Sequence, residues 1–98
     1  GCAIKYDKSS EMLYATVRGS NEIKIFSTSQ IVPKFIQKIP SFGLNPRDID
    51  ISGDLAAVTN LESNSLSLYK KYADGTLEHL NNLSTTSPAF VKIKKCWT

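Results

Sequence analysis

Two arginines are the residues of this chain whose type and placement could do chemistry. Arg18 follows one expected strand, and Arg47 lies where an outer strand is expected to cross to the next unit. A guanidinium group offers two parallel, charged hydrogen bonds to a carboxylate or a phosphate. In the alternative interpretation, each arginine pairs with a neighbouring acid, such as Asp48 or Glu62, and only holds its loop. The residue types therefore indicate an anion site and leave a structural role open.

No complete catalytic set accompanies these arginines in the sequence. Glu62 is a third candidate for the same site, since its loop corresponds to the loop of Arg18. His79 is expected on an outer strand, where a solvent-facing role is favoured over that of a base. The serines lie in expected turns without a nucleophile elbow around them. Neither a metal-ligand spacing nor a glycine-rich phosphate loop is present in the sequence, so we expect no cofactor and no metal.

A segment that occurs twice indicates which elements position the arginines. Ser-Asn-Glu-Ile-Lys-Ile-Phe at 20–26 recurs as Ser-Asn-Ser-Leu-Ser-Leu-Tyr at 63–69, 43 positions later. Repeats of about 40–50 residues built from alternating strands are typical of propeller blades. The chain is therefore predicted to be all-β, with two four-stranded antiparallel blades and a closing strand, a fragment of a larger propeller. We expect the first blade at 1–40, the second at 41–84, and the closing strand and tail at 85–98.

Two-residue alternation of apolar and polar side chains predicts the individual strands. The expected strands span 3–6, 12–17, 23–26, 32–39, 48–51, 55–59, 66–69, 76–80 and 89–94. Pro33 restricts its strand to the edge of a sheet, and Asp74-Gly75 predicts a hairpin turn. In an up-and-down blade, the loops that carry Arg18 and Arg47 emerge at the same end. Both arginines are then expected to converge on one mouth of a central channel.

Composition limits the class of protein. The chain has 98 residues, 41% hydrophobic and 21% charged, which suits at most one globular domain. No apolar run is long enough for a membrane helix, and the scattered lysines behind the net charge of +3 do not form a nucleic-acid-binding patch. Cys2 and Cys96 are interpreted as free thiols of a cytoplasmic protein, with a terminal staple as the alternative. Because the chain does not begin with Met, we expect a fragment or a processed form.

Four segments resemble one family of propellers in the family's own order. Residues 4–19 are similar to the pattern I-x-I-S-P-D-G-K-x-L-Y-x-x-N-R-G of the seven-bladed lactonases, the 6-phosphogluconolactonase type. Residues 45–49 resemble its P-R-[DG]-F segment, 52–60 resemble S-G-K-Y-L-x-V-A-N, and 87–91 resemble S-P-x-x-V. The sequence departs from this family at Val17, where Asn is usual, and at Leu61, where a polar residue is usual. By this resemblance the chain is the last two blades and the closing strand.

The resemblance implies a function for the arginines. Arg18 and Arg47 would line the active-site cleft, bind an anionic sugar lactone and stabilise the oxyanion formed when water attacks the ring ester. Glu62 would be a further substrate-binding residue. The resemblance also implies a hydrolase of the pentose phosphate pathway, acting in the cytoplasm without a cofactor.

Two other functions remain open at this stage. A propeller can act as a non-catalytic interaction or self-assembling module, because a fold does not determine a function. A muconate-lactonising relative would share the same propeller. Two blades alone are expected to expose apolar faces such as segment 55–58, so the chain should associate with copies of itself or with missing blades.

Overall fold

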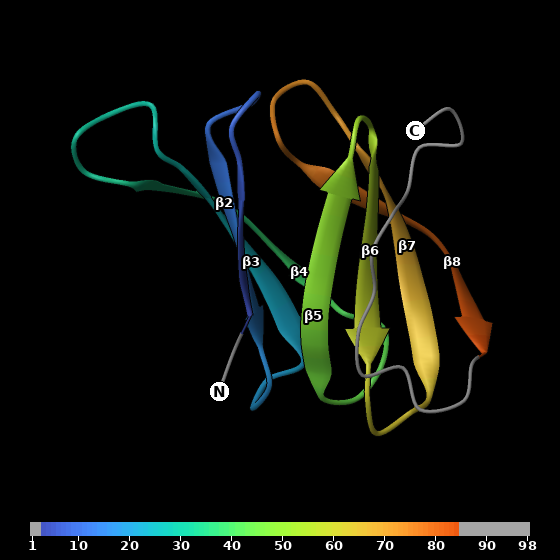
Figure 1. The fold of residues 1–98 in the computed structure, drawn as a ribbon. Helices are drawn as coiled ribbons and strands as arrows, with labels where there is room; N and C mark the ends of the chain where they lie inside the picture. The colour runs from blue at the N-terminus through green and yellow to red at the C-terminus, as the bar shows by residue number, and fades with distance from the viewer. Residues whose placement is uncertain (1–2, 85–98) are drawn as a thin grey trace.

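Eight β-strands form two four-stranded antiparallel sheets in the computed structural model, which describes residues 3–84 (Figure 1). The strands are β1 (Ile4–Asp7), β2 (Met12–Val17), β3 (Glu22–Ser27), β4 (Lys34–Pro40), β5 (Pro46–Ser52), β6 (Leu55–Asn60), β7 (Ser65–Lys71) and β8 (Leu77–Ser84). Each sheet follows chain order, β1-β2-β3-β4 and β5-β6-β7-β8. The all-β prediction of two four-stranded units is confirmed. The expected strand at 89–94 and both cysteines lie outside the described residues.

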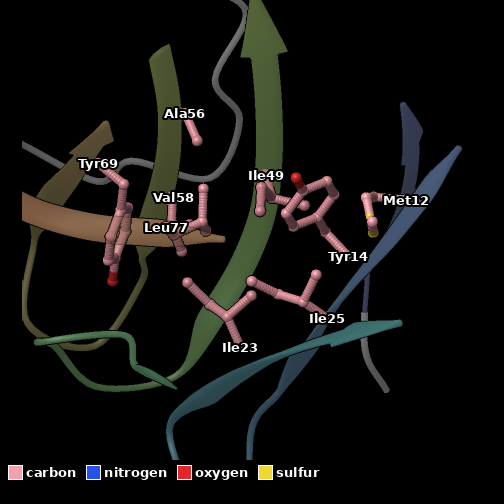
Figure 2. Packing of buried hydrophobic residues seen from close by; sticks show 9 residues of the cluster. All are labelled: Met12, Tyr14, Ile23, Ile25, Ile49, Ala56, Val58, Tyr69 and Leu77. Atoms are coloured by element: carbon pink, nitrogen blue, oxygen red, sulfur yellow. The ribbon is translucent and has the colours of Figure 1, made fainter. Parts of the chain in front are cut away.

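Alternation of more and less buried side chains along β2 and β3 creates the first sheet's side of the core between the sheets. On β2, the side chains of Met12, Tyr14 and Thr16 are buried, and the residues between them are only half-buried. Figure 2 shows Tyr14 and the β3 residue Ile25 directed toward Ile49 on β5. The buried cluster comprises Met12, Tyr14, Ile23, Ile25, Ile49, Ala56, Val58, Tyr69 and Leu77. β2, β3 and β6 each contribute two residues that are two positions apart, as the period of a β-strand requires.

One proline and one glycine occupy the places in the fold that their backbone geometry favours. β4 lies at an edge of the first sheet, and Pro33 directly precedes it, where a missing backbone N–H does not interrupt a ladder. The hairpin predicted at Asp74-Gly75 joins β7 to β8, with Gly75 at a φ of 89°. Such a φ is accessible to glycine without a steric penalty.

One expectation about the surface is wrong. Segment 55–58 does not expose an apolar face, since Ala56, Ala57 and Val58 are at most 1% exposed. Ala56 and Val58 point into the core that both sheets share, and Ala57, on the opposite face of β6, is buried as well. Exposed apolar side chains occur instead on other strands, and they include Ile4, Tyr6 and Phe35 of the first sheet.

Polar contacts also join the two sheets. The buried hydroxyl of Tyr14 donates to the carbonyl oxygen of Gly75 at 2.7 Å. At the same end of the sheets, the Lys71 ammonium lies 3.1 Å from an oxygen of Asp7. Burial raises the pKa of the Asp7 carboxyl group, but hydrogen bonds from Ser10 and Ser9 and the neighbouring Lys71 outweigh it, so the pKa lies below its ordinary value. These bonds fix how one sheet sits on the other. No helix that could cross a membrane occurs in the part of the chain that the structure describes.

Candidate functional site

Three chain connections gather at one end of the two sheets, the lower end in Figure 1. They are the turn between β2 and β3 (18–21), the link between β4 and β5 (41–45), and the turn between β6 and β7 (61–64). Hydrogen bonds tie the three together, from Ser41 N to Asn21 O at 2.9 Å and from Leu61 N to Asn45 O at 3.0 Å. Arg18 and Glu62 therefore belong to neighbouring connections, as the up-and-down order of the strands requires.

The side chain of Arg18 reaches from the first connection to the second. Its Nε donates a hydrogen bond to Oδ1 of Asn45 at 2.6 Å. Arg18 as a whole is an exposed residue. A bond at Nε restricts the orientation of this long side chain while leaving the terminal N–H groups for another acceptor. Arg18 thus bonds to a neutral amide rather than to an acid.

Asn45 is held in place on three sides. Its backbone N–H donates to Oδ1 of Asn21 at 2.8 Å, and its carbonyl oxygen accepts from the N–H of Leu61. The residue is 7% exposed and has a φ of 60°. Asparagine tolerates this left-handed backbone conformation better than most residues that carry a side chain. The acceptor for Arg18 is therefore part of a rigid support.

A buried polar cluster supports the link between β4 and β5 from the side of the core. Nδ2 of Asn60 donates to Oγ of Ser67 at 2.8 Å, and that hydroxyl donates to the carbonyl oxygen of Ser41 at 2.5 Å. Gly43 lies against the Asn60 side chain so closely that an added Cβ would come within 3.0 Å of it. A glycine at this position lets the link pass over the end of β6. The cluster thereby defines where the backbone leading into Asn45 runs.

Arg47 lies just beyond this link, two residues after Asn45 and at the start of β5. The pairing of β5 with β6 is irregular between Pro46 and Asp48, so Arg47 occupies a bulge, where it is exposed. A bulge redirects a side chain away from the regular ladder. Within residues 3–84, the structure contains no ion pair between Arg47 and an acid. The same holds for Arg18, so the alternative in which these arginines pair with Asp48 or Glu62 receives no support from these residues.

Glu62 lies next to this group of residues, but it bonds to them through its backbone and not through its side chain. Its N–H donates to the carbonyl oxygen of Leu44 at 3.1 Å, and its side chain is exposed. The structure therefore brings all three predicted site residues to one end of the sheets. Arg18 bonds to Asn45, two residues before Arg47, whereas the carboxylate of Glu62 makes no hydrogen bond to a residue within 3–84.

The sequence matches the model of a known family over almost the whole chain. Residues 1–93 match the family model described as lactonase, 7-bladed beta-propeller. The chain belongs to this lactonase family. The resemblance seen in the sequence motifs and the prediction of a propeller fragment are therefore both confirmed. No curated protein matches the chain.

Solved structures support the same fold. The periplasmic gluconolactonase PpgL of Pseudomonas aeruginosa is 20% identical with a TM-score of 0.79, over 87% of this chain and 25% of that one. A protein from Lactobacillus plantarum is 28% identical with a TM-score of 0.79, over 85% and 26%. A proposed 6-phosphogluconolactonase from Bacteroides fragilis is 19% identical with a TM-score of 0.80, over 89% and 26%. The lactonase-family chain thus spans about a quarter of the length of these relatives.

His79 of this lactonase-family chain corrects one expectation. It lies on the outer strand β8, as predicted, but its ring is half-buried rather than facing solvent. The ring stacks on Phe42 at 4.0 Å between centroids, and its Nε2 lies 2.7 Å from Oδ1 of Asn82. Phe42 belongs to the link between β4 and β5, so His79 helps to hold that link. Among residues 3–84, no three His, Cys, Asp or Glu side chains form a group that could hold a metal ion.

The residues that sequence analysis missed are three asparagines. Asn21 and Asn45 position the connections, and Asn60 supports them from the core. A signal was present for two of them. Asn21 ends a turn in the repeated Ser-Asn segment, and Asn45 precedes Pro46, whose fixed geometry favours a defined turn. Their role as partners of Arg18 and of each other had no local signal, because these contacts join separate connections.

Proposed function

We propose that this chain supplies part of the substrate site of a sugar-lactone hydrolase, in which Arg18 and Arg47 bind an anionic lactone such as 6-phosphogluconolactone. The observation that carries the proposal is the hydrogen bond from Arg18 to Asn45, two residues before Arg47. It ties the exposed Arg18 side chain to the stretch of backbone from which Arg47, also exposed, projects. Membership of the lactonase family supports the reaction class. Glu62 is a neighbouring candidate for contact with the sugar hydroxyl groups.

The arginines would act by electrostatic stabilisation of the charge that forms during the reaction. Water adds to the carbonyl carbon of the lactone, the ring C–O bond breaks, and the proton of the water ends on the released ring oxygen. The product is an open-chain hydroxy acid. Negative charge grows on the carbonyl oxygen during the attack, and a preorganised guanidinium group stabilises it more strongly than mobile water does. No cofactor is needed for this reaction.

The phosphate or carboxylate of the substrate gives the second arginine its role. A guanidinium fork matches two oxygens of such a group with two parallel hydrogen bonds. One arginine would hold the anionic group while the other faces the ester. Orientation of this kind lowers the barrier because the entropy of alignment is lost on binding rather than in the transition state. The cytoplasmic location expected from the sequence belongs to the same proposal.

A substrate comparison tests the proposal. The full-length protein would be assayed for hydrolysis of 6-phosphogluconolactone, for hydrolysis of the uncharged gluconolactone, and for lactonisation of a muconate. We expect the phosphorylated lactone to be preferred through a lower KM, and this preference to weaken as salt concentration rises. Turnover of the muconate alone would assign the chain to the muconate-lactonising relatives. Absence of turnover with all three would contradict the enzymatic proposal and favour a binding module.

A further inference from the structure

We propose that Asn45 is a positioning residue that orients the guanidinium group of Arg18 for an anionic ligand, an inference that rests on the function proposed above. Arg18 lies at an exposed position, and an exposed arginine samples many rotamers. The hydrogen bond from its Nε to Oδ1 of Asn45, at 2.6 Å, removes much of that freedom. It also occupies the side edge of the guanidinium group at Nε. The terminal edge, with its two NH₂ groups, then stays available for a bidentate contact.

Asn45 is suited to this role because its own position is fixed and does not shift when the Arg18 side chain moves. Two further hydrogen bonds fix its backbone, one with Asn21 of the turn before β3 and one with Leu61 of the turn before β7. Each of the three connections at this end of the sheets thus contributes to the position of one amide oxygen. A side chain anchored in this way restricts the motion of the exposed Arg18 guanidinium group, because the sheets hold the anchor in place.

The neutral charge of the asparagine matters as much as its geometry. A carboxylate at this position would also accept from Nε, but it would offset the positive charge that an anionic ligand needs. The amide orients the group without neutralising it. Position 61 lies 43 residues after position 18 and is its counterpart in the repeat, but it carries Leu in place of Arg. Arg18 and Leu61 both bond to Asn45, one through its side chain and the other through its backbone. Within residues 3–84, therefore, the side chain of Asn45 orients a single arginine, Arg18.

A double-mutant cycle tests the proposal in the full-length protein, with 6-phosphogluconate as the probe and calorimetry as the measurement. Asn45→Gly keeps the left-handed backbone and removes the amide acceptor. We expect this variant to bind the probe about tenfold more weakly. In the Arg18→Ala background, the same change should have no further effect, because a positioning residue acts only through its partner. Glu11→Gly is the matched control, since Glu11 has a similar φ of 57° in the turn between β1 and β2, at the opposite end of the sheets, and the affinity of this variant should be unchanged.

Two further measurements keep the test decisive if Asn45→Gly folds poorly. Arg18→Lys retains the charge but lacks Nε, so it should bind the probe about tenfold more weakly than the wild-type protein. In nuclear magnetic resonance spectra of the wild-type protein, the Nε–H of Arg18 should exchange slowly with water.

The outcomes separate this inference from the proposed function. Unchanged affinity in Arg18→Ala would overturn the anion site itself. Weaker binding in Arg18→Ala, together with wild-type affinity in Arg18→Lys or additive effects in the cycle, would overturn only the role of Asn45. Fast exchange of the Arg18 Nε–H in the wild-type protein would do the same.

Discussion

The side chain of Gln37 and the backbone of Leu77 form two hydrogen bonds that join the outer strands of the two sheets. Nε2 of Gln37 donates to the carbonyl oxygen of Leu77 at 3.0 Å, and the N–H of Leu77 donates to Oε1 at 2.8 Å. The amide group thereby replaces a missing strand partner at the start of β8. Because Leu77 belongs to the buried cluster, both backbone groups need such partners.

Replacing Gln37 with Leu should therefore lower the free energy of unfolding by about 1–3 kcal/mol, since two backbone groups would lose their partners. The measurement is urea unfolding followed by fluorescence. Gln30→Leu is the matched control, because Gln30 is exposed in the loop before β4. The two variants would have equal unfolding midpoints if the bridge between the sheets contributed nothing.

Gly43 should tolerate no side chain. In Gly43→Ala the new Cβ would overlap the side chain of Asn60 in its buried cluster, and we expect a loss of about 1–3 kcal/mol of stability. Gly19→Ala is the control, since no atom lies within 4 Å of a Cβ added there. Thermal unfolding of both variants gives the comparison. A melting temperature for Gly43→Ala at or above that of the control would show that the link moves aside easily.

Removal of either arginine should slow lactone hydrolysis in the full-length protein while leaving its fold intact. Loss of one preorganised charged donor typically costs about 2–4 kcal/mol of transition-state stabilisation, roughly 10²–10³ in rate. Arg18→Ala and Arg47→Ala are the variants, and kcat/KM is the measured quantity. Lys8→Ala removes an exposed positive charge from the turn between β1 and β2, at the opposite end of the sheets, and serves as the control. Wild-type rates in both arginine variants would refute the site.

Stability should fall between pH 10 and pH 12 in part because of Tyr14. Burial raises the pKa of its hydroxyl group from 10.0 to about 12. The folded chain therefore keeps the phenol neutral where the unfolded chain ionises, and the stabilisation present below pH 10 is lost as the pH rises to 12. Tyr14→Phe should be less stable at neutral pH, since the carbonyl of Gly75 loses its donor, and less sensitive to alkali. An unchanged alkaline slope in urea titrations would contradict this explanation.

The isolated 98-residue chain should associate with itself through the first sheet. The strand registers place Tyr6, Leu13, Phe26 and Phe35 in one row across β1 to β4, on the face opposite the buried Tyr14. Tyr6 and Phe35 are 48% and 52% exposed, so this row offers an apolar surface to a second copy. Sedimentation should show dimers or larger species at micromolar concentration.

A double substitution checks that this row is responsible for the association. Tyr6→Lys combined with Phe35→Lys should shift the chain toward monomer by placing two charges on that surface. Leu80→Lys alters an exposed leucine of β8, on the other sheet, and should leave the association as it was. A wild-type chain that sediments as a stable monomer would disprove the prediction.

Much of the fold was determined by the sequence through local rules. Alternation of apolar residues marked strands such as β2 and β3, because successive side chains of a strand point to opposite faces of its sheet. Asp74-Gly75 marked its hairpin, and Pro33 marked an edge, because both act on the backbone of their own neighbourhood. The placement of Arg18 and Arg47 at one end followed from counting antiparallel strands. The repeat at 43 residues completed the prediction of two similar sheets.

The tertiary structure alone decided which groups meet. Asn45 as the partner of Arg18, Leu77 as the partner of Gln37, and the stacking of His79 on Phe42 all join segments that lie 27 to 40 residues apart or on different sheets. Such contacts depend on the distance and angle at which one sheet packs on the other. The residues next to a side chain in the sequence do not determine that geometry. The partners of Arg18 and His79 could therefore be identified only from the arrangement of both sheets.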